Sequence, residues 1–158
     1  MKRGKKIRPD QISKSVKDIL KKRVKGRVEQ VRKAVTIGAM EVRNTAILDI
    51  QRGVKSGKTY QLYDPKSTHV ASKGGEAPAT DTGFLVSQIT TNTFVIGASV
   101  IGQIVSAAPY SKWLEFGHPA RDGSFVEARP FMQPALEQNK KKIKEIFIRE
   151  GILKRLVE

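Results

Sequence analysis

The chain of 158 residues contains no cysteine, only two histidines and no long hydrophobic run. The absence of cysteine excludes disulfides and thiolate metal sites. The two histidines, His69 and His118, lie far apart in the sequence, so no cluster of metal ligands is expected around them. No apolar segment approaches the roughly 20 residues that a membrane-spanning helix needs, and none follows the basic N-terminus as it would in a secretory signal. We therefore expect a protein that is made inside the cell, has no membrane contact and carries no metal or cofactor.

Acidic residues are scarce relative to basic ones, with 15 Asp and Glu against 30 Lys and Arg, a net charge of +15. Residues 1–33 hold 14 basic and three acidic residues, a net charge of +11, which leaves +4 for the rest of the chain. This basic segment contains the candidate polyanion or partner contacts Lys14, Lys17, Lys21, Lys22, Arg23, Lys25 and Arg27. They could neutralise DNA phosphates without reading sequence, bind an acidic partner, or form a solvated helix face.

Helical periodicity dominates the first third of the chain. Apolar residues recur every three or four positions from Ile12 to Ile50, no proline interrupts them, and Gly53 is a natural stop. The pattern predicts a helix over residues 10–52, about 65 Å long. A compact domain of this size does not need such a helix, so its first half is expected to project from the body or to pack on another subunit. We expect residues 1–9 to be a basic flexible tail and residues 10–158 to form a single domain.

The middle of the chain is rich in turn formers and then in β-branched residues. Residues 53–83 are expected to form an extended loop, with at most a short strand near residues 59–63. Residues 84–108 favour two or three antiparallel strands, with turns near Thr91–Asn92 and Ala98–Gly102. A short helix over residues 81–89 is equally compatible with the sequence.

The last third of the chain is predicted to return to helix. One or two helical turns over residues 109–117 end at Gly117, and a second helix opens at Pro130 and breaks near Gly151. The predicted class is α+β, with a long N-terminal helix, a small antiparallel sheet of about three to four strands, and a C-terminal helix.

No residue pattern predicts catalysis. The segment from Gly53 to Thr59 resembles a phosphate-binding loop, but three residues separate its glycines where that loop needs four, and a helix precedes it in place of a strand. Asp64 and Asp81 lack a nucleophile and base around them, and acid–base work by Glu115 would need a cleft that the sequence does not reveal. We therefore expect no catalytic residues.

Three segments of the chain carry short motifs. Residues 109–118, PYSKWLEFGH, are similar to the pattern YA-x-x-x-E-F-G-T, with Ser111 and His118 in place of the alanine and the threonine. Residues 128–136, ARPFMQPAL, are similar to x-x-P-F-L-x-P-A-L, and residues 72–85, SKGGEAPATDTGFL, to G-x-x-P-x-x-D-T-G-x-L. With these three motifs the chain resembles the tail-completion family of tailed bacteriophages, also called head–tail joining or neck proteins. The resemblance covers roughly residues 40–140 and leaves the basic N-terminal segment outside it.

The resemblance implies a ring-forming structural subunit of the virion, in six or twelve copies around the DNA channel at the head–tail junction. Such a neck, tail-completion or tail-terminator ring is assembled in the host bacterial cytoplasm. It joins the DNA-filled head to the tail and contacts portal, adaptor, stopper or tail-tube proteins, with nonspecific contact with packaged DNA. The alternative is a small basic protein that binds DNA without sequence preference.

The candidate contacts for such an assembly cluster in the segment after residue 109. Aromatic anchors and charged loop residues suit an assembly surface, and the candidates are Tyr110, Trp113, Glu115, Phe116, His118, Arg121, Glu127 and Arg129. For Trp113 and Phe116, helical spacing favours packing in the core over a partner contact, and the same holds for Phe131.

Overall fold

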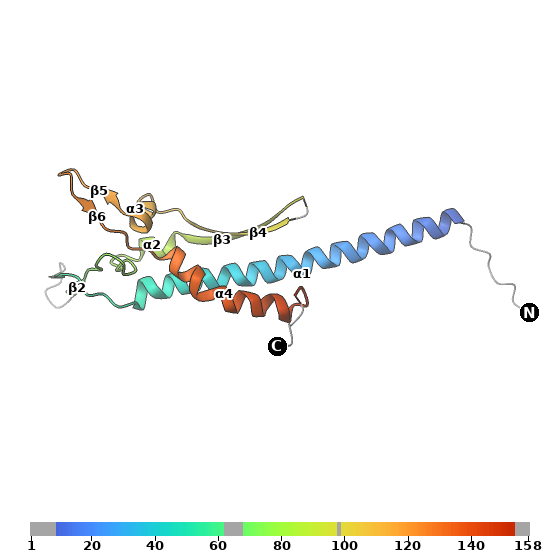
Figure 1. The fold of residues 1–158 in the computed structure, drawn as a ribbon, viewed down its shortest axis with the longest axis horizontal. Helices are drawn as coiled ribbons and strands as arrows, with labels where there is room; N and C mark the ends of the chain where they lie inside the picture. Colours follow the sequence, from blue (N-terminus) through green and yellow to red (C-terminus); the bar gives the residue numbers. More distant parts are fainter. Residues whose placement is uncertain (1–8, 62–67, 98, 154–158) are drawn as a thin grey trace, which may run out of the picture.

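A single long helix runs along most of the body of the protein and projects beyond it at its N-terminal end (Figure 1). The computed structural model describes residues 9–61, 68–97 and 99–153. Its elements are α1 (Pro9–Arg52), β1 (Thr59–Gln61), β2 (Thr68–Val70), α2 (Phe84–Ser87), β3 (Ile89–Ile96), β4 (Ser99–Ser106), α3 (Ser111–Phe116), β5 (His118–Pro119), β6 (Phe125–Val126) and α4 (Met132–Arg149). The predicted α+β class is therefore confirmed.

The strands are arranged differently from the predicted single sheet of three to four strands. Among the described residues they form three antiparallel pairs, β1 with β2, β3 with β4, and β5 with β6. Only the β3–β4 hairpin is long, with eight residues in each strand. A two-stranded hairpin is marginal by itself, so this one depends on the helix against which it packs.

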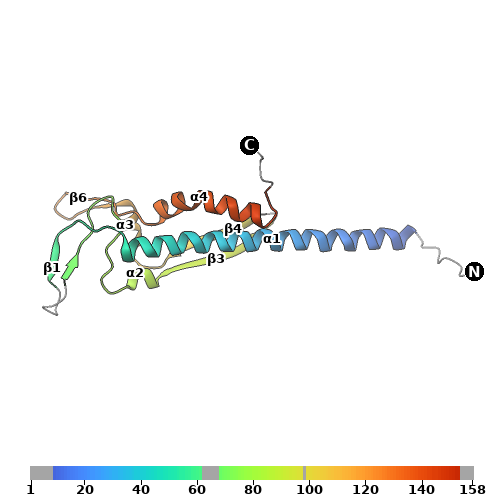
Figure 2. The ribbon, with the colours of Figure 1, turned by 90° about the horizontal axis from the view of Figure 1, so that it is seen from below.

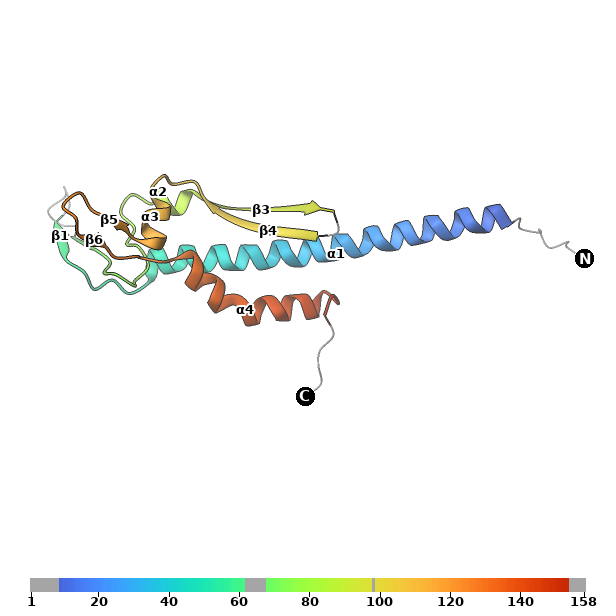
Figure 3. The same ribbon diagram turned by 45° about the horizontal axis from the view of Figure 1, so that its top comes forward.

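Helix α1 confirms the predicted helix 10–52 to within one residue. It ends at Arg52, where the N–H of Gly53 donates to the carbonyl of Asp49 at 3.0 Å. The predicted tail lies outside the described residues, apart from Pro9, which opens the helix. Burial divides the helix in two, because every residue from 14 to 30 is exposed and the first buried residue is Ala34. The first half projects past the body, as predicted (Figure 3).

The second half of α1 lies between the β3–β4 hairpin on one side and α4 on the other (Figure 2). The core cluster on this half and its neighbours is formed by Val42, Ala46, Ile50, Leu85, Ile89, Ala108, Phe131 and Ala135. Small residues bring the elements close together. A Cβ on Gly102 of β4 would lie 2.8 Å from Cγ1 of Val35, and one on Gly38 would lie 3.5 Å from Ile143 of α4.

The turn predicted near Thr91–Asn92 is wrong, because β3 runs straight through these residues and pairs Thr91 with Ile104. Threonine is a good strand former, and the pairing with β4 extends the strand to Ile96. The chain reverses at Gly97, whose φ of 58° favours glycine; Ala98 lies outside the described residues. The alternative of a short helix over residues 81–89 is confirmed only for Phe84–Ser87, which form α2, because Ile89 opens β3.

The remaining boundaries follow the turn residues. Strand β1 occupies the first part of the predicted strand 59–63, whose last two residues lie outside the described residues. The prediction of at most one strand in residues 53–83 is wrong, because β2 pairs with β1 there. Helix α3 ends at Phe116, with Gly117 as its C-cap, and α4 ends at Arg149, before Gly151 with its φ of 70°. These positions agree with the predicted stops.

Candidate assembly site

The three segments that carry the family resemblance meet at one end of the body. The N–H of Arg129 donates to the carbonyl of Leu114 at 2.6 Å, and the N–H of Gly75 donates to the carbonyl of Ala128 at 2.8 Å. The rings of Phe84 and Tyr110 lie 6.3 Å apart. Residues 72–85, 109–118 and 128–136, which we call the junction, are therefore one structural unit although the chain visits them separately.

Glu115 ties α3 to the start of α4 within the junction. Its Oε2 accepts the backbone N–H groups of Phe131 at 2.9 Å and Met132 at 3.0 Å, and its Oε1 accepts that of Gln133 at 2.9 Å. Phe131, the N-cap residue of α4, makes no side-chain cap of its own. The carboxylate thus satisfies three donors that a helix start leaves open and lies at the positive end of the helix dipole. Glu115, predicted as a partner contact, is engaged inside the subunit.

Glu127 and Arg129, also predicted as contacts, hold the first segment of the junction, residues 72–85, against the last. Arg129 Nε donates to the carbonyl of Ser72 at 3.2 Å, and its Nη1 donates to the carbonyl of Glu127 at 3.4 Å. Glu127 packs over Gly74, where a Cβ would overlap the carboxylate. Both residues therefore help to position the loop that ends in α2.

The aromatic residues of α3 point outward. Phe116 is 77% exposed and Trp113 is 48% exposed, whereas Phe131 is 1% exposed. Core packing is therefore confirmed for Phe131 and wrong for the other two. The helix has only six residues, and Leu114 and Glu115 occupy its inner side. Helical spacing identified residues that share a face, but in so short a helix it could not identify which face is covered.

An open apolar groove lies beside Phe116. It has a volume of about 630 Å³ between α3, β4 and α4. Its apolar lining includes Val42, Ile104, Phe116, Pro130, Met132 and Leu136. Near the hairpin tip, Phe94 and Ile96 are 37% and 60% exposed on one face of β3, and Val95 is 44% exposed on the opposite face. The spacing of these residues predicted a strand but not their exposure. An open apolar groove such as the one beside Phe116 is typical of contact surfaces.

The other predicted contacts lie at the rim of the junction. Tyr110 is 37% exposed, and Arg121 is exposed at the tip between β5 and β6. His118 is half-buried on β5, 5.8 Å from the ring of Trp113, and its Nδ1 has no hydrogen-bond partner among the described residues.

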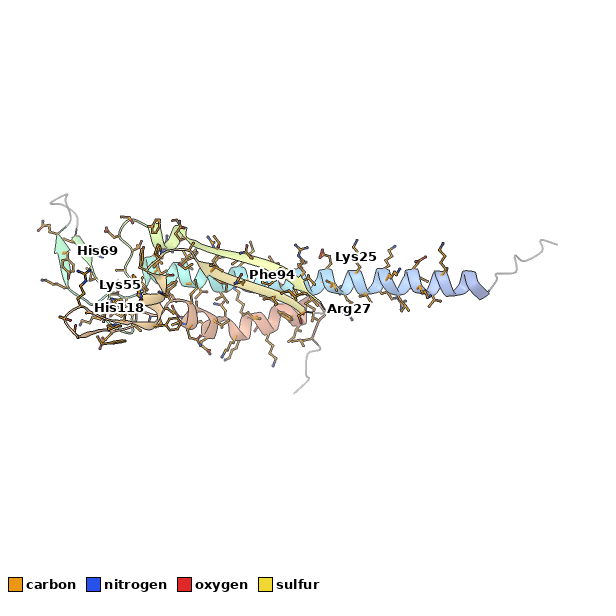
Figure 4. All side chains as sticks on the ribbon, turned by 90° about the horizontal axis from the view of Figure 1, so that it is seen from above. Lys25, Arg27, Lys55, His69, Phe94 and His118 are labelled. Atoms are coloured by element: carbon orange, nitrogen blue, oxygen red, sulfur yellow. The ribbon has the colours of Figure 1, made fainter. Side chains whose placement is uncertain are left out.

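His69 lies on the separate strand β2 (Figure 4). Within the described ranges, no three His, Asp or Glu side chains are grouped closely enough to hold a metal ion.

The basic candidates lie on the projecting half of α1. Arg27 donates to the carbonyl of Gly151 at 3.1 Å, in the turn after α4, and Lys25 is exposed close by (Figure 4). In the part of the chain that the structure describes, no ion pair involves Lys14, Lys17, Lys21, Lys22, Arg23 or Lys25. Their charges are therefore available to a partner.

No family model, curated protein or solved structure matches this chain. Among the described residues, no helix is both long and apolar enough to cross a membrane.

Proposed function

We propose that this protein is a structural subunit of a phage head–tail connector. It would form a neck, tail-completion or tail-terminator ring of six or twelve copies around the DNA channel, between the head and the tail. The observation that carries the proposal is the exposed Phe116 beside the apolar groove, on a junction built from the three family-like segments. A monomer leaves this surface in water, whereas a subunit in a ring contacts a neighbour on either side.

The junction supports a structural role because its polar groups are used for positioning. Glu115, the acidic residue at its centre, accepts three backbone N–H groups, and Arg129 links two loops. The rigid frame they form presents Trp113 and Phe116 to solvent. We assign the contact role to these aromatics together with Tyr110, His118 and Arg121, and we assign no catalytic role. The partners would be further copies of the chain and the portal, adaptor, stopper or tail-tube proteins of the virion.

The test is the size of the purified protein, measured by light scattering across concentration and salt and followed by negative-stain imaging. We expect discrete rings with a central hole for the wild type. Phe116→Ser should abolish them, because it removes the most exposed aromatic ring beside the groove. Val54→Ser is the matched control, since Val54 is 81% exposed and lies away from the groove. A wild type that stays monomeric under all conditions contradicts the ring, and rings that survive Phe116→Ser contradict this interface.

The second candidate is DNA binding without sequence preference, and the exposed basic half of α1 favours it. Lys and Arg that neutralise phosphates release counterions, so log affinity falls linearly against log salt by about 0.9 per phosphate contact. A monomer or dimer that binds duplex DNA with a steep slope of this kind would favour the second candidate over the ring.

A further inference from the structure

The projecting half of α1 repeats the buried face of its second half. Val16, Leu20, Val24 and Val28, which we call the exposed stripe, are 48%, 53%, 63% and 36% exposed. Eighteen residues correspond to about five turns of helix, so each lies on the same face as the residue 18 positions later. Those residues are Ala34, Gly38, Val42 and Ala46, and all four are buried under the hairpin and α4. The face that is covered inside the body therefore continues uncovered along the projection.

The charge around the exposed stripe is strongly positive. Between Lys14 and Lys33 there are nine basic and two acidic residues, a net charge of +7. Lys17 and Lys21, and likewise Lys21 and Lys25, are like-charged pairs four residues apart, which weaken a helix. Every residue from 14 to 30 is exposed, and the tertiary hydrogen bond from this range is that of Arg27 to Gly151. Among the described residues, no ion pair with the body offsets the repulsion between Lys17, Lys21 and Lys25. The projection would gain helical stability from a partner that supplies negative charge.

The exposed stripe and the charge together restrict the occupant. Duplex DNA would neutralise the lysines, but its phosphate backbone offers no apolar surface to cover valine and leucine. A second copy of the chain would bring its own net charge of +15 and repel the first. An acidic amphipathic helix can both cover the apolar stripe and neutralise the basic charge. Its apolar face covers the stripe while its carboxylates pair with the basic residues on either side. This is the helix-in-groove mode of recognition.

We propose that the exposed stripe is the docking site for an acidic amphipathic segment of a partner protein. Lys21 and Arg23, which lie on opposite sides of the stripe, pair with carboxylates of that segment. The inference goes beyond the ring and does not depend on it, because the stripe lies on the projecting helix and the proposed ring interface lies on the junction.

The experiment measures fluorescence anisotropy of a labelled synthetic peptide titrated with the full chain. The peptide has three heptads with leucine at the a and d positions and glutamate at e and g. A peptide of the same composition, scrambled so that its leucines share no face, is the control for charge alone. We expect the patterned peptide to bind more tightly than the scrambled one, and the far-UV circular dichroism of the mixture to show a gain in helix.

Two single substitutions at adjacent positions distinguish the loss of an apolar side chain on the stripe from the loss of an equally exposed one beside it. Leu20 and Ile19 are both 53% exposed, but they lie about 100° apart around the helix, and only Leu20 belongs to the stripe. Leu20→Ser should weaken binding of the patterned peptide by about five- to tenfold, from the apolar area it removes. Ile19→Ser should change it less than about twofold. Both side chains are exposed, so both variants should retain the fold, which circular dichroism checks.

The same titration with a 20-base-pair duplex and with vesicles of phosphatidylglycerol and phosphatidylcholine tests the other two occupants. Equal loss of affinity in both variants, or no preference for the patterned peptide over the scrambled one, would overturn the proposal. Tighter binding to duplex DNA that is indifferent to Leu20→Ser would assign the projection to DNA. Tighter, Leu20-dependent binding to the vesicles would assign it to a membrane surface. None of these results depends on whether the chain forms rings.

Discussion

Substitution of Glu115 by alanine removes the acceptor for three backbone N–H groups at the start of α4 at once. A single lost helix cap costs about 0.5–2 kcal/mol, and a hydrogen bond to a charged group is worth about 1.5–3 kcal/mol. Phe131 is buried and Met132 is half-buried, so water replaces the carboxylate poorly at these two amides, whereas Gln133 is exposed. We therefore expect Glu115→Ala to lower the free energy of unfolding by about 2–4 kcal/mol.

Thermal unfolding followed by circular dichroism measures this loss. For a chain of this size each kcal/mol lowers the midpoint by about 2–4 °C, so the expected decrease is about 4–16 °C. Glu115→Gln keeps one oxygen acceptor and should show a smaller decrease. Glu145→Ala is the matched control, because Glu145 lies exposed on α4 and makes no ion pair within the described part of the chain; its effect should stay within about 0.5 kcal/mol. If Glu115→Ala unfolds like the control, the carboxylate does not cap α4.

Two further predictions test packing and charge. Gly102→Ala should destabilise the fold by about 1–3 kcal/mol in urea unfolding, because its methyl group meets Val35 at 2.8 Å. Gly26→Ala should stabilise α1 by about 0.5–1 kcal/mol, because the added methyl group meets nothing within 4 Å. If the two substitutions changed the free energy of unfolding equally, the close approach of the β3–β4 hairpin to α1 would be contradicted. Hydrogen bonds from the Ser56 hydroxyl and from nearby backbone amides lower the pKa of Glu76 from 4.5 to about 2. Folding favours the ionised carboxylate of Glu76, so its contribution to the free energy of unfolding is present above pH 4.5 and is lost as the pH falls toward 2. An NMR titration of the Glu76 carboxyl with a midpoint near 4.5 would refute this prediction.

Local features of the sequence were sufficient for the helices. The spacing of apolar residues and the absence of proline up to Gly53 predicted α1 to within one residue, and Gly117 and Gly151 predicted where α3 and α4 end. These boundaries depend on residues within a few positions of one another. The concentration of basic charge on the first half of α1 is likewise a property of the sequence alone.

Contacts between distant segments could not be predicted in this way. Nothing near Glu115 in the sequence indicates that its carboxylate caps a helix starting 17 residues later. The strand pairing that carries β3 through Thr91 and Asn92 depends on β4, and the turn predicted there was wrong. In the candidate assembly site, the sequence predicted both Glu115 and Phe116 as contact residues. The fold distinguishes them, because Glu115 is hydrogen-bonded inside the subunit and Phe116 is exposed.

Val24 and Val42 show most simply what the sequence alone could not predict. They lie on the same face of one helix, 18 residues apart, and the periodicity of the sequence treats them alike. Val24 is 63% exposed and Val42 is 2% exposed. The sequence determined that the two side chains share a face and that the helix is continuous between them. Only the tertiary structure decided which of them is covered, because the hairpin and α4 that bury Val42 reach that helix from distant parts of the chain and do not extend to Val24.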